Sequence, residues 1–307
     1  MHLISCQTKM RQLIILSAIL SVSFAAGQHT IYPDTFPNVA GFRSVLVKMD
    51  DSCSNVAEKN KLIGKYFFDN TGNTIEYVSI WDSKVNGRKI YTYADNQLVS
   101  QQNFSSMKYS HPGSSTLEWD STSLSDEITF KYAGKRLASY SVYFPTLKKI
   151  YFDNSFEYDS NGRLTSETVK NYYDSFSAKL GMVSYAITQE KKYFYHDTVI
   201  FANYYQNNVL HSTEEIVETK TGKKLQQTLT SVKGDILNKS AYKYNNKLQL
   251  IEIKVTETGY DGFGNSYDRV IPPDKTILNY DSTGKLTSRQ IFYDNKPCLT
   301  VRYIYLK

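Results

Sequence analysis

The sequence predicts an all-β protein: an antiparallel meander of repeated β-hairpins that forms a curled sheet, a solenoid or a soluble barrel. Three observations indicate this class. A turn phrase recurs along the chain, the segments between turns alternate apolar and polar residues, and helical patterns are nearly absent. The 307 residues are 41% hydrophobic and 21% charged, a globular composition with enough apolar material for a sizeable core.

The recurring phrase is clearest in "YDSNGRLTSE", from Tyr158, and "YDSTGKLTSR", from Tyr280. In both, Asp suits the first position of a type I turn and Gly accepts the left-handed conformation that follows. This chemistry predicts a hairpin with a glycine bulge, in which Asp159 faces Arg163. The phrase's core, an aromatic residue, Asp, then Ser or Asn, begins at Phe68, Trp81, Trp119, Phe152, Tyr158, Tyr173, Tyr280 and Tyr293.

The turns also predict which side chains meet across the strands. A two-residue turn at Asp95-Asn96 and a type II′ turn at Gly134-Lys135 give the same kind of pair as the longer loops. The aromatic–leucine pairs expected are Tyr93 with Leu98, Tyr132 with Leu137, Tyr158 with Leu164 and Tyr280 with Leu286. In "ETKTGKKL" the turn recurs without the pair, and we expect Glu218 opposite Lys224 and Val217 opposite Leu225.

Between the turns the residues alternate as in half-buried strands. In "DEITFKYA" (126–133) and "LIEIKVTE" (250–257), apolar and polar residues occupy opposite faces. Only two segments, beginning at Ser54 and Ser175, suit a short helix, and Gly181 interrupts the second. No linker or charge block divides the chain. We therefore expect residues 28–307 to form a single all-β hairpin-repeat domain.

The N-terminus has the layout of a secretory signal peptide. From Met10, "MRQLIILSAILSVSFAAGQ" supplies a positive residue, an apolar run too short to span a membrane, and a small-residue exit. We assign residues 1–27 to the signal peptide, with cleavage after Gly27 or, as the alternative, after Ala25. Met10 is an alternative start. The mature protein is expected to be secreted, periplasmic or at the cell surface, with no membrane span.

Charge argues against several classes of partner. Cleavage removes Lys9 and Arg11, so the formal charge falls from +6 to +4. The basic residues are dispersed, which argues against a nucleic-acid partner. An outer-membrane barrel needs strands with an apolar outward face, and residues 230–247 do not supply one.

No motif for catalysis, a cofactor or a metal ion is present. The histidines have no zinc-ligand spacing, and the chain lacks a nucleophile elbow, a P-loop and a dinucleotide fingerprint. We therefore expect no cofactor and no metal. Cys53 and Cys298 remain after cleavage; they form a disulfide in an oxidising compartment or stay as two unpaired thiols.

The phrase Tyr-Asp-x-x-Gly-Arg/Lys-Leu, at Tyr158–Leu164 and Tyr280–Leu286, resembles the YD repeat of the RHS family of secreted and cell-surface proteins. The resemblance implies stacked β-hairpins, export, and a role in shells or in carbohydrate and surface contacts. The chain is far shorter than RHS shells that enclose a toxin, and it ends in a strand pattern. A toxin role is therefore not expected.

These observations favour an exported, non-catalytic binding or surface protein that contacts glycans or the cell envelope. The 26 tyrosines suit half-buried strands, or an exposed aromatic platform for sugar rings with Trp81 and Trp119 as its best members. One alternative is a structural or assembly component that binds another envelope protein. Another is a glycan hydrolase with a cross-strand carboxylate pair.

Overall fold

A computed structural model describes Phe36, Val39 and residues 41–53, 58–109, 117–177, 181–258 and 273–307. Every regular element in these residues is a β-strand. The strands are β1 (Ser44–Asp51), β2 (Glu58–Phe68), β3 (Thr74–Trp81), β4 (Lys84–Ala94), β5 (Gln97–Tyr109), β6 (Leu117–Ala133), β7 (Arg136–Phe144), β8 (Lys149–Tyr158), β9 (Leu164–Ser177), β10 (Gly181–His196), β11 (Val199–Gln206), β12 (Val209–Glu218), β13 (Lys224–Ser231), β14 (Ile236–Tyr244), β15 (Leu250–Thr258), β16 (Lys275–Tyr280), β17 (Leu286–Tyr293) and β18 (Lys296–Leu306).

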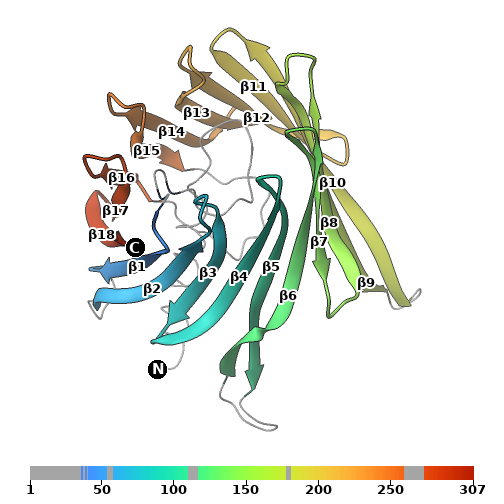
Figure 1. Cartoon of the computed structure of the whole chain (residues 1–307). Coiled ribbons are helices and arrows are strands. Elements are labelled where there is room, and N and C mark those ends of the chain that lie inside the picture. The colour runs from blue at the N-terminus through green and yellow to red at the C-terminus, as the bar shows by residue number, and fades with distance from the viewer. Residues whose placement is uncertain are drawn as a thin grey trace, which may run out of the picture.

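The strands form one closed antiparallel barrel (Figure 1). Each strand pairs with its neighbour in sequence, and β1 pairs with both β2 and β18. The closing ladder runs from Ser44 opposite Leu306 to Asp51 opposite Leu299. Closure gives every described strand a hydrogen-bonded neighbour on both sides. The all-β meander expected from the sequence is confirmed, and the barrel is the form that it takes.

One end of the barrel is built from the polar turns predicted above. We call it the polar rim; it carries the turns that follow the even-numbered strands β2 to β16. At the β8–β9 turn the Gly162 N–H donates to the Asp159 carbonyl at 2.9 Å, and Gly162 has a φ of 81°. The Asp159 carboxylate accepts from the backbone N–H and the guanidinium of Arg163 at 2.9 and 2.7 Å.

The expected cross-strand pairs are present. Register places Tyr93 opposite Leu98, Tyr132 opposite Leu137, Tyr158 opposite Leu164 and Tyr280 opposite Leu286. In the Gly134-Lys135 turn only Gly134 has a positive φ, as a type II′ turn requires. In the Asp95-Asn96 turn both residues have a positive φ, as in a type I′ turn.

The tyrosines of the polar rim also link one hairpin to the next. Each hydroxyl donates to the backbone carbonyl of a leucine on the adjacent strand. The bonds join Tyr132 to Leu98 at 3.0 Å, Tyr158 to Leu137 at 2.9 Å, Tyr195 to Leu164 at 2.8 Å, Tyr280 to Leu250 at 3.0 Å and Tyr305 to Leu286 at 2.8 Å. Each such bond contributes about 1 kcal/mol, so the repeated phrase stabilises contacts between hairpins as well as within them.

Three sequence predictions were wrong in detail. Val217 lies opposite Gln226, not Leu225, because a register shift follows the Glu218–Lys224 pair. The segments that suited a helix are strands where the structure describes them: β2 begins at Glu58, and β9 continues to Ser177. Strand pairing overrides weak helix propensity here. The phrase copies at Trp119, Phe152 and Tyr173 lie inside strands rather than at turns.

The buried side chains lie on the concave face of the barrel. The Phe36 ring contacts Tyr66 of β2 and Tyr303 of β18, with centroids 4.8 and 5.6 Å apart. These strands lie on either side of β1, so one ring bridges non-neighbouring strands. In the described chain, the buried members of the main apolar cluster are Phe36, Val39 and residues of β1–β9 and β16–β18. The inner wall over β10–β15 has a different character, described below.

The barrel's closing seam carries additional crosslinks. Cys53 and Cys298 form a disulfide, with Cα atoms 4.9 Å apart and 245 residues of sequence separation. On the outer face of the seam, both Nη atoms of Arg302 bond the carboxylate of Asp50. Such a two-pronged pair adds geometric specificity to the β1–β18 register.

Candidate functional site

A groove of about 570 Å³ lies over β14–β16, where the barrel wall has its shortest ladder in the described residues. Strands β15 and β16 share only three register pairs, from Glu252 opposite Ile277 to Lys254 opposite Lys275. Ile253 faces the same side as Tyr242, whose hydroxyl lies in the inner wall's polar cluster. Because neighbouring residues of a strand alternate, Glu252 and Lys254 face outward. The groove is therefore on the outer face.

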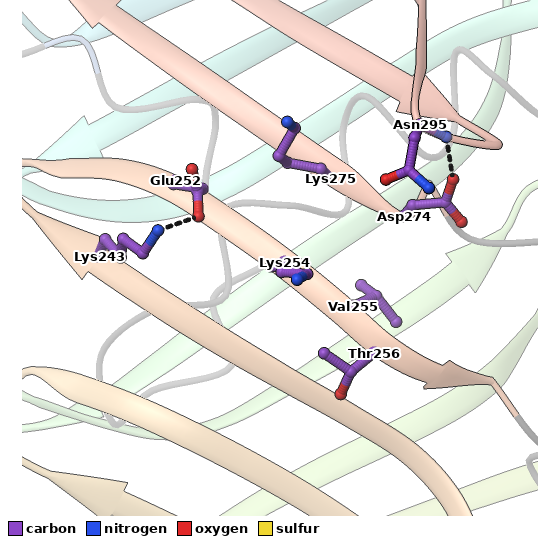
Figure 2. A pocket seen from close by; sticks show the side chains of 8 residues that line it. All are labelled: Lys243, Glu252, Lys254, Val255, Thr256, Asp274, Lys275 and Asn295. Atoms are coloured by element: carbon purple, nitrogen blue, oxygen red, sulfur yellow. Dashed lines mark hydrogen bonds and ion pairs between the residues drawn. The ribbon is translucent and has the colours of Figure 1, made fainter.

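Polar side chains dominate the lining of the groove (Figure 2). The residues are Lys243, Glu252, Lys254, Val255, Thr256, Asp274, Lys275 and Asn295. Ligand sites of comparable volume commonly place a few polar groups where they converge on a ligand. The groove has the size and the hydrogen-bonding groups to hold a small polar ligand or part of a larger one.

One of the three lysines in the groove lining forms an ion pair, and the other two do not form one with a described residue. Lys243 and Glu252 form an ion pair, with Nζ and Oε1 2.6 Å apart. Lys254 and Lys275 instead lie directly opposite each other across the β15–β16 ladder. Among the described side chains, no carboxylate lies within ion-pair distance of either lysine. Directly opposed like charges destabilise a sheet by roughly 0.2–1 kcal/mol.

The two carboxylates of the groove are held apart. Asp274 accepts a hydrogen bond from the backbone N–H of Asn295 at 3.0 Å, while Glu252 is paired toward β14 with Lys243. Asp274 lies three residues from the register partner of Glu252, which places the two Cα atoms about 11 Å apart. Each of the two described carboxylates therefore already has a partner within the groove lining.

The inner wall over β10–β14 contains a buried polar cluster. The Lys191 ammonium lies 2.6 Å from Glu214 Oε2, and their side chains are 7% and 2% exposed. The Tyr204 hydroxyl donates to the same oxygen at 2.9 Å, and Gln227 Nε2 donates to Oε1. Gln227 Oε1 in turn accepts from Tyr242 at 2.9 Å. Buried charges persist when they are paired and hydrogen-bonded in this way.

The protonation of the cluster follows from its burial and charges. Burial alone raises the pKa of Glu214, but the Lys191 ammonium and the bonds it accepts hold that pKa below its usual range. Burial lowers the pKa of Lys224, opposed by the charge of Glu214. Burial, with the charge of Glu214, raises the pKa of Tyr242 to about 12. The ion pair at the centre of the network is buried, and we assign the network a structural role.

The residues predicted for an aromatic platform lie on different strands near the rim opposite the polar rim. Trp81 ends β3 and is partly buried, with Lys61 Nζ 4.8 Å from its ring centroid. Trp119 lies on β6, opposite Met107. Three strand spacings separate β3 from β6, so their backbones are roughly 14 Å apart. The structure does not place the two residues side by side.

The remaining site expectations concern metals and membrane spans. In the described ranges, no group of three or more His, Cys, Asp or Glu side chains is arranged to hold a metal ion. No helix among these residues is long and apolar enough to cross a bilayer. The predicted signal peptide, residues 1–27, lies outside the described residues.

Sequence reasoning identified neither the groove nor the buried ion pair. The groove depends on how β16 returns to β15 after the intervening segment, which no local pattern specifies. One local sequence pattern could have indicated that Lys191 faces inward. In "KKYFYH", Lys191 alternates with Tyr193 and Tyr195, so period two puts it on the tyrosine face.

Comparison with known proteins finds likeness only at the level of structure. No family model and no curated protein matches the sequence. A porin-like protein from Bacteroides uniformis aligns with 89% of this chain and 99% of its own, at 9% identity and a TM-score of 0.26. A porin-like protein from Bacteroides vulgatus aligns over 71% and 97%, at 10% identity and a TM-score of 0.33. TcdB2-TccC3-TEV aligns over 84% of this chain but only 16% of its own, at 12% identity and a TM-score of 0.25.

Proposed function

We propose that this protein is an exported, non-catalytic binding protein of the cell envelope or cell surface, and that the outer groove over β14–β16 contacts a glycan. The observation that carries the proposal is the 570 Å³ groove itself, lined by donors and acceptors, with six of its eight lining residues on strands β14–β16. Sites on strands hold such groups more accurately than sites on loops. The resemblance to the YD repeat gives a separate reason to expect carbohydrate contacts.

Charged side chains on the outer face of the barrel favour an aqueous environment over lipid. Outward positions carry Lys48 and Asp50 on β1, Arg88 on β4 and Lys131 on β6, which pair or alternate with other polar residues. Charged residues at the middle of a lipid-facing strand cost about 2–4 kcal/mol each. This pattern and the N-terminal leader favour a secreted, periplasmic or surface-attached protein.

The proposal is tested with folded mature protein on a broad glycan array, followed by titration calorimetry on the best ligands. Thr256→Trp, which fills the groove, is expected to abolish binding. Thr129→Trp, on the outer face of β6, serves as the matched control and is expected to bind normally. An array that stays blank, or binding that survives Thr256→Trp, contradicts the proposal.

A second candidate function is assembly with another envelope protein. It is favoured by exposed aliphatic residues at hairpin tips of the rim opposite the polar rim: Val209, Val232 and Leu147 are 69%, 58% and 54% exposed. A photocrosslinker at Val209 is expected to capture one discrete partner in intact cells, and one at Asn96 of the polar rim is not. Equal, diffuse labelling from both positions argues against this role.

A further inference from the structure

Two lysines of the groove occupy directly opposed positions on neighbouring strands. Lys254 and Lys275 are register partners on the outer face, and paired residues of an antiparallel ladder have their Cβ atoms about 5 Å apart. They sit on the shortest ladder of the described barrel, where few backbone bonds hold the strands together. Figure 2 shows Lys254 and Lys275 on neighbouring strands, and the third lysine, Lys243, joined to Glu252.

The described carboxylates of the groove do not neutralise the charges of Lys254 and Lys275. The only carboxylates among its described lining residues are Glu252 and Asp274. Glu252 is bound to Lys243, and Asp274 accepts from the Asn295 backbone. The Lys275 ammonium instead lies over the Phe292 ring, 4.4 Å from its centroid. Cation–π attraction holds a cation without neutralising it.

We propose that the groove binds an anionic group, and that Lys254 and Lys275 hold its oxygens together. The ligand class is an acidic glycan carrying a carboxylate or a phosphate ester, both of which present anionic oxygens to lysine. A bound anion would turn the like-charge pair into two favourable contacts. Thr256 and Asn295 add hydrogen-bonding groups for neighbouring hydroxyls. The glycan part rests on the proposed function; the anion site does not.

The test uses three probes at low salt: polygalacturonate, the neutral polymer dextran, and inorganic phosphate. We expect wild-type protein to bind polygalacturonate at least tenfold more tightly than dextran, and the preference to shrink as salt rises. Lys254→Gln is expected to weaken acidic binding about fivefold to tenfold, and the double variant with Lys275→Gln to remove the preference. Lys131→Gln, an exposed outer-face lysine on β6, is the matched control.

A second readout is independent of any polymer. Lys254→Gln without ligand is expected to raise the melting temperature, because it removes one of the two opposed charges and keeps the Lys275–Phe292 contact, and phosphate is expected to stabilise the wild type but not the double variant. Equal binding of both polymers, blocked by Thr256→Trp, overturns the acidic preference and keeps glycan binding. Phosphate stabilisation without polymer binding keeps the anion site and overturns the glycan. No response to any probe overturns both.

Discussion

The disulfide between Cys53 and Cys298 makes a quantitative prediction about stability. Its loop spans 245 residues of sequence separation, nearly all of the described chain. Loop-closure entropy for such a length amounts to about 5.5 kcal/mol at 25 °C, and measured disulfides typically contribute about 2–4 kcal/mol. The β1–β18 ladder closes the barrel independently of the bond. Reduction is therefore expected to leave the fold intact while lowering its free energy of unfolding by about 3–5 kcal/mol.

Guanidinium unfolding followed by far-ultraviolet circular dichroism measures this loss. Oxidised protein, reduced protein and the Cys53→Ser/Cys298→Ser variant are compared under identical conditions. The last two are expected to coincide at a lower midpoint, with native spectra before unfolding. Identical midpoints for all three samples would refute the reasoning. Both thiols reacting with an alkylating agent in the native, unreduced protein would do so as well.

Three further substitutions test the buried polar cluster of the inner wall and the turns of the polar rim. Glu214→Gln leaves the buried Lys191 ammonium without its carboxylate partner. It is expected to lower the free energy of unfolding, measured with urea at neutral pH, by about 3–5 kcal/mol. Because the folded pKa of Glu214 is lowered, its contribution is present above the unfolded pKa of about 4.3 and is lost as pH falls through the lower folded value. If the difference in free energy of unfolding between variant and wild type stays unchanged well below pH 4, this reasoning is wrong. Tyr158→Phe removes the bond to the Leu137 carbonyl and is expected to cost about 1 kcal/mol, with an unchanged dichroism spectrum. Gly284→Ala, at a φ of 87°, is expected to cost about 1–2 kcal/mol, and no loss would show that the turn adapts.

The sequence predicted those parts of the fold that short turns control. An Asp–Gly loop specifies its own conformation and the register of the next few residues, which is why Tyr158 opposite Leu164 was predictable. Val217 shows the limit of this reasoning, because a one-residue shift after the turn changed its partner. Closure between β1 and β18 was not predictable, since no local pattern records which distant strand completes a sheet.

The candidate site was less predictable than the fold for a related reason. Lys254 and Lys275 each look like an ordinary solvated residue on an alternating strand, and only the β15–β16 register makes them neighbours. Lys191 and Glu214 likewise come from strands two apart in the sheet. Tryptophan, by contrast, attracted a functional hypothesis by its residue type alone. Residue type identifies candidates, whereas three-dimensional neighbours decide among them.

The seam between the first and last strands has a consequence for biosynthesis. During synthesis, β1 can pair with β2 early, but its other edge stays unpaired until β18 has been made. Throughout that interval the nascent chain offers an open edge to any extended polypeptide nearby. Intermolecular pairing at this edge is therefore expected to compete with folding until β18 docks. Deletion of β18 would leave that edge open permanently and make the product prone to self-association.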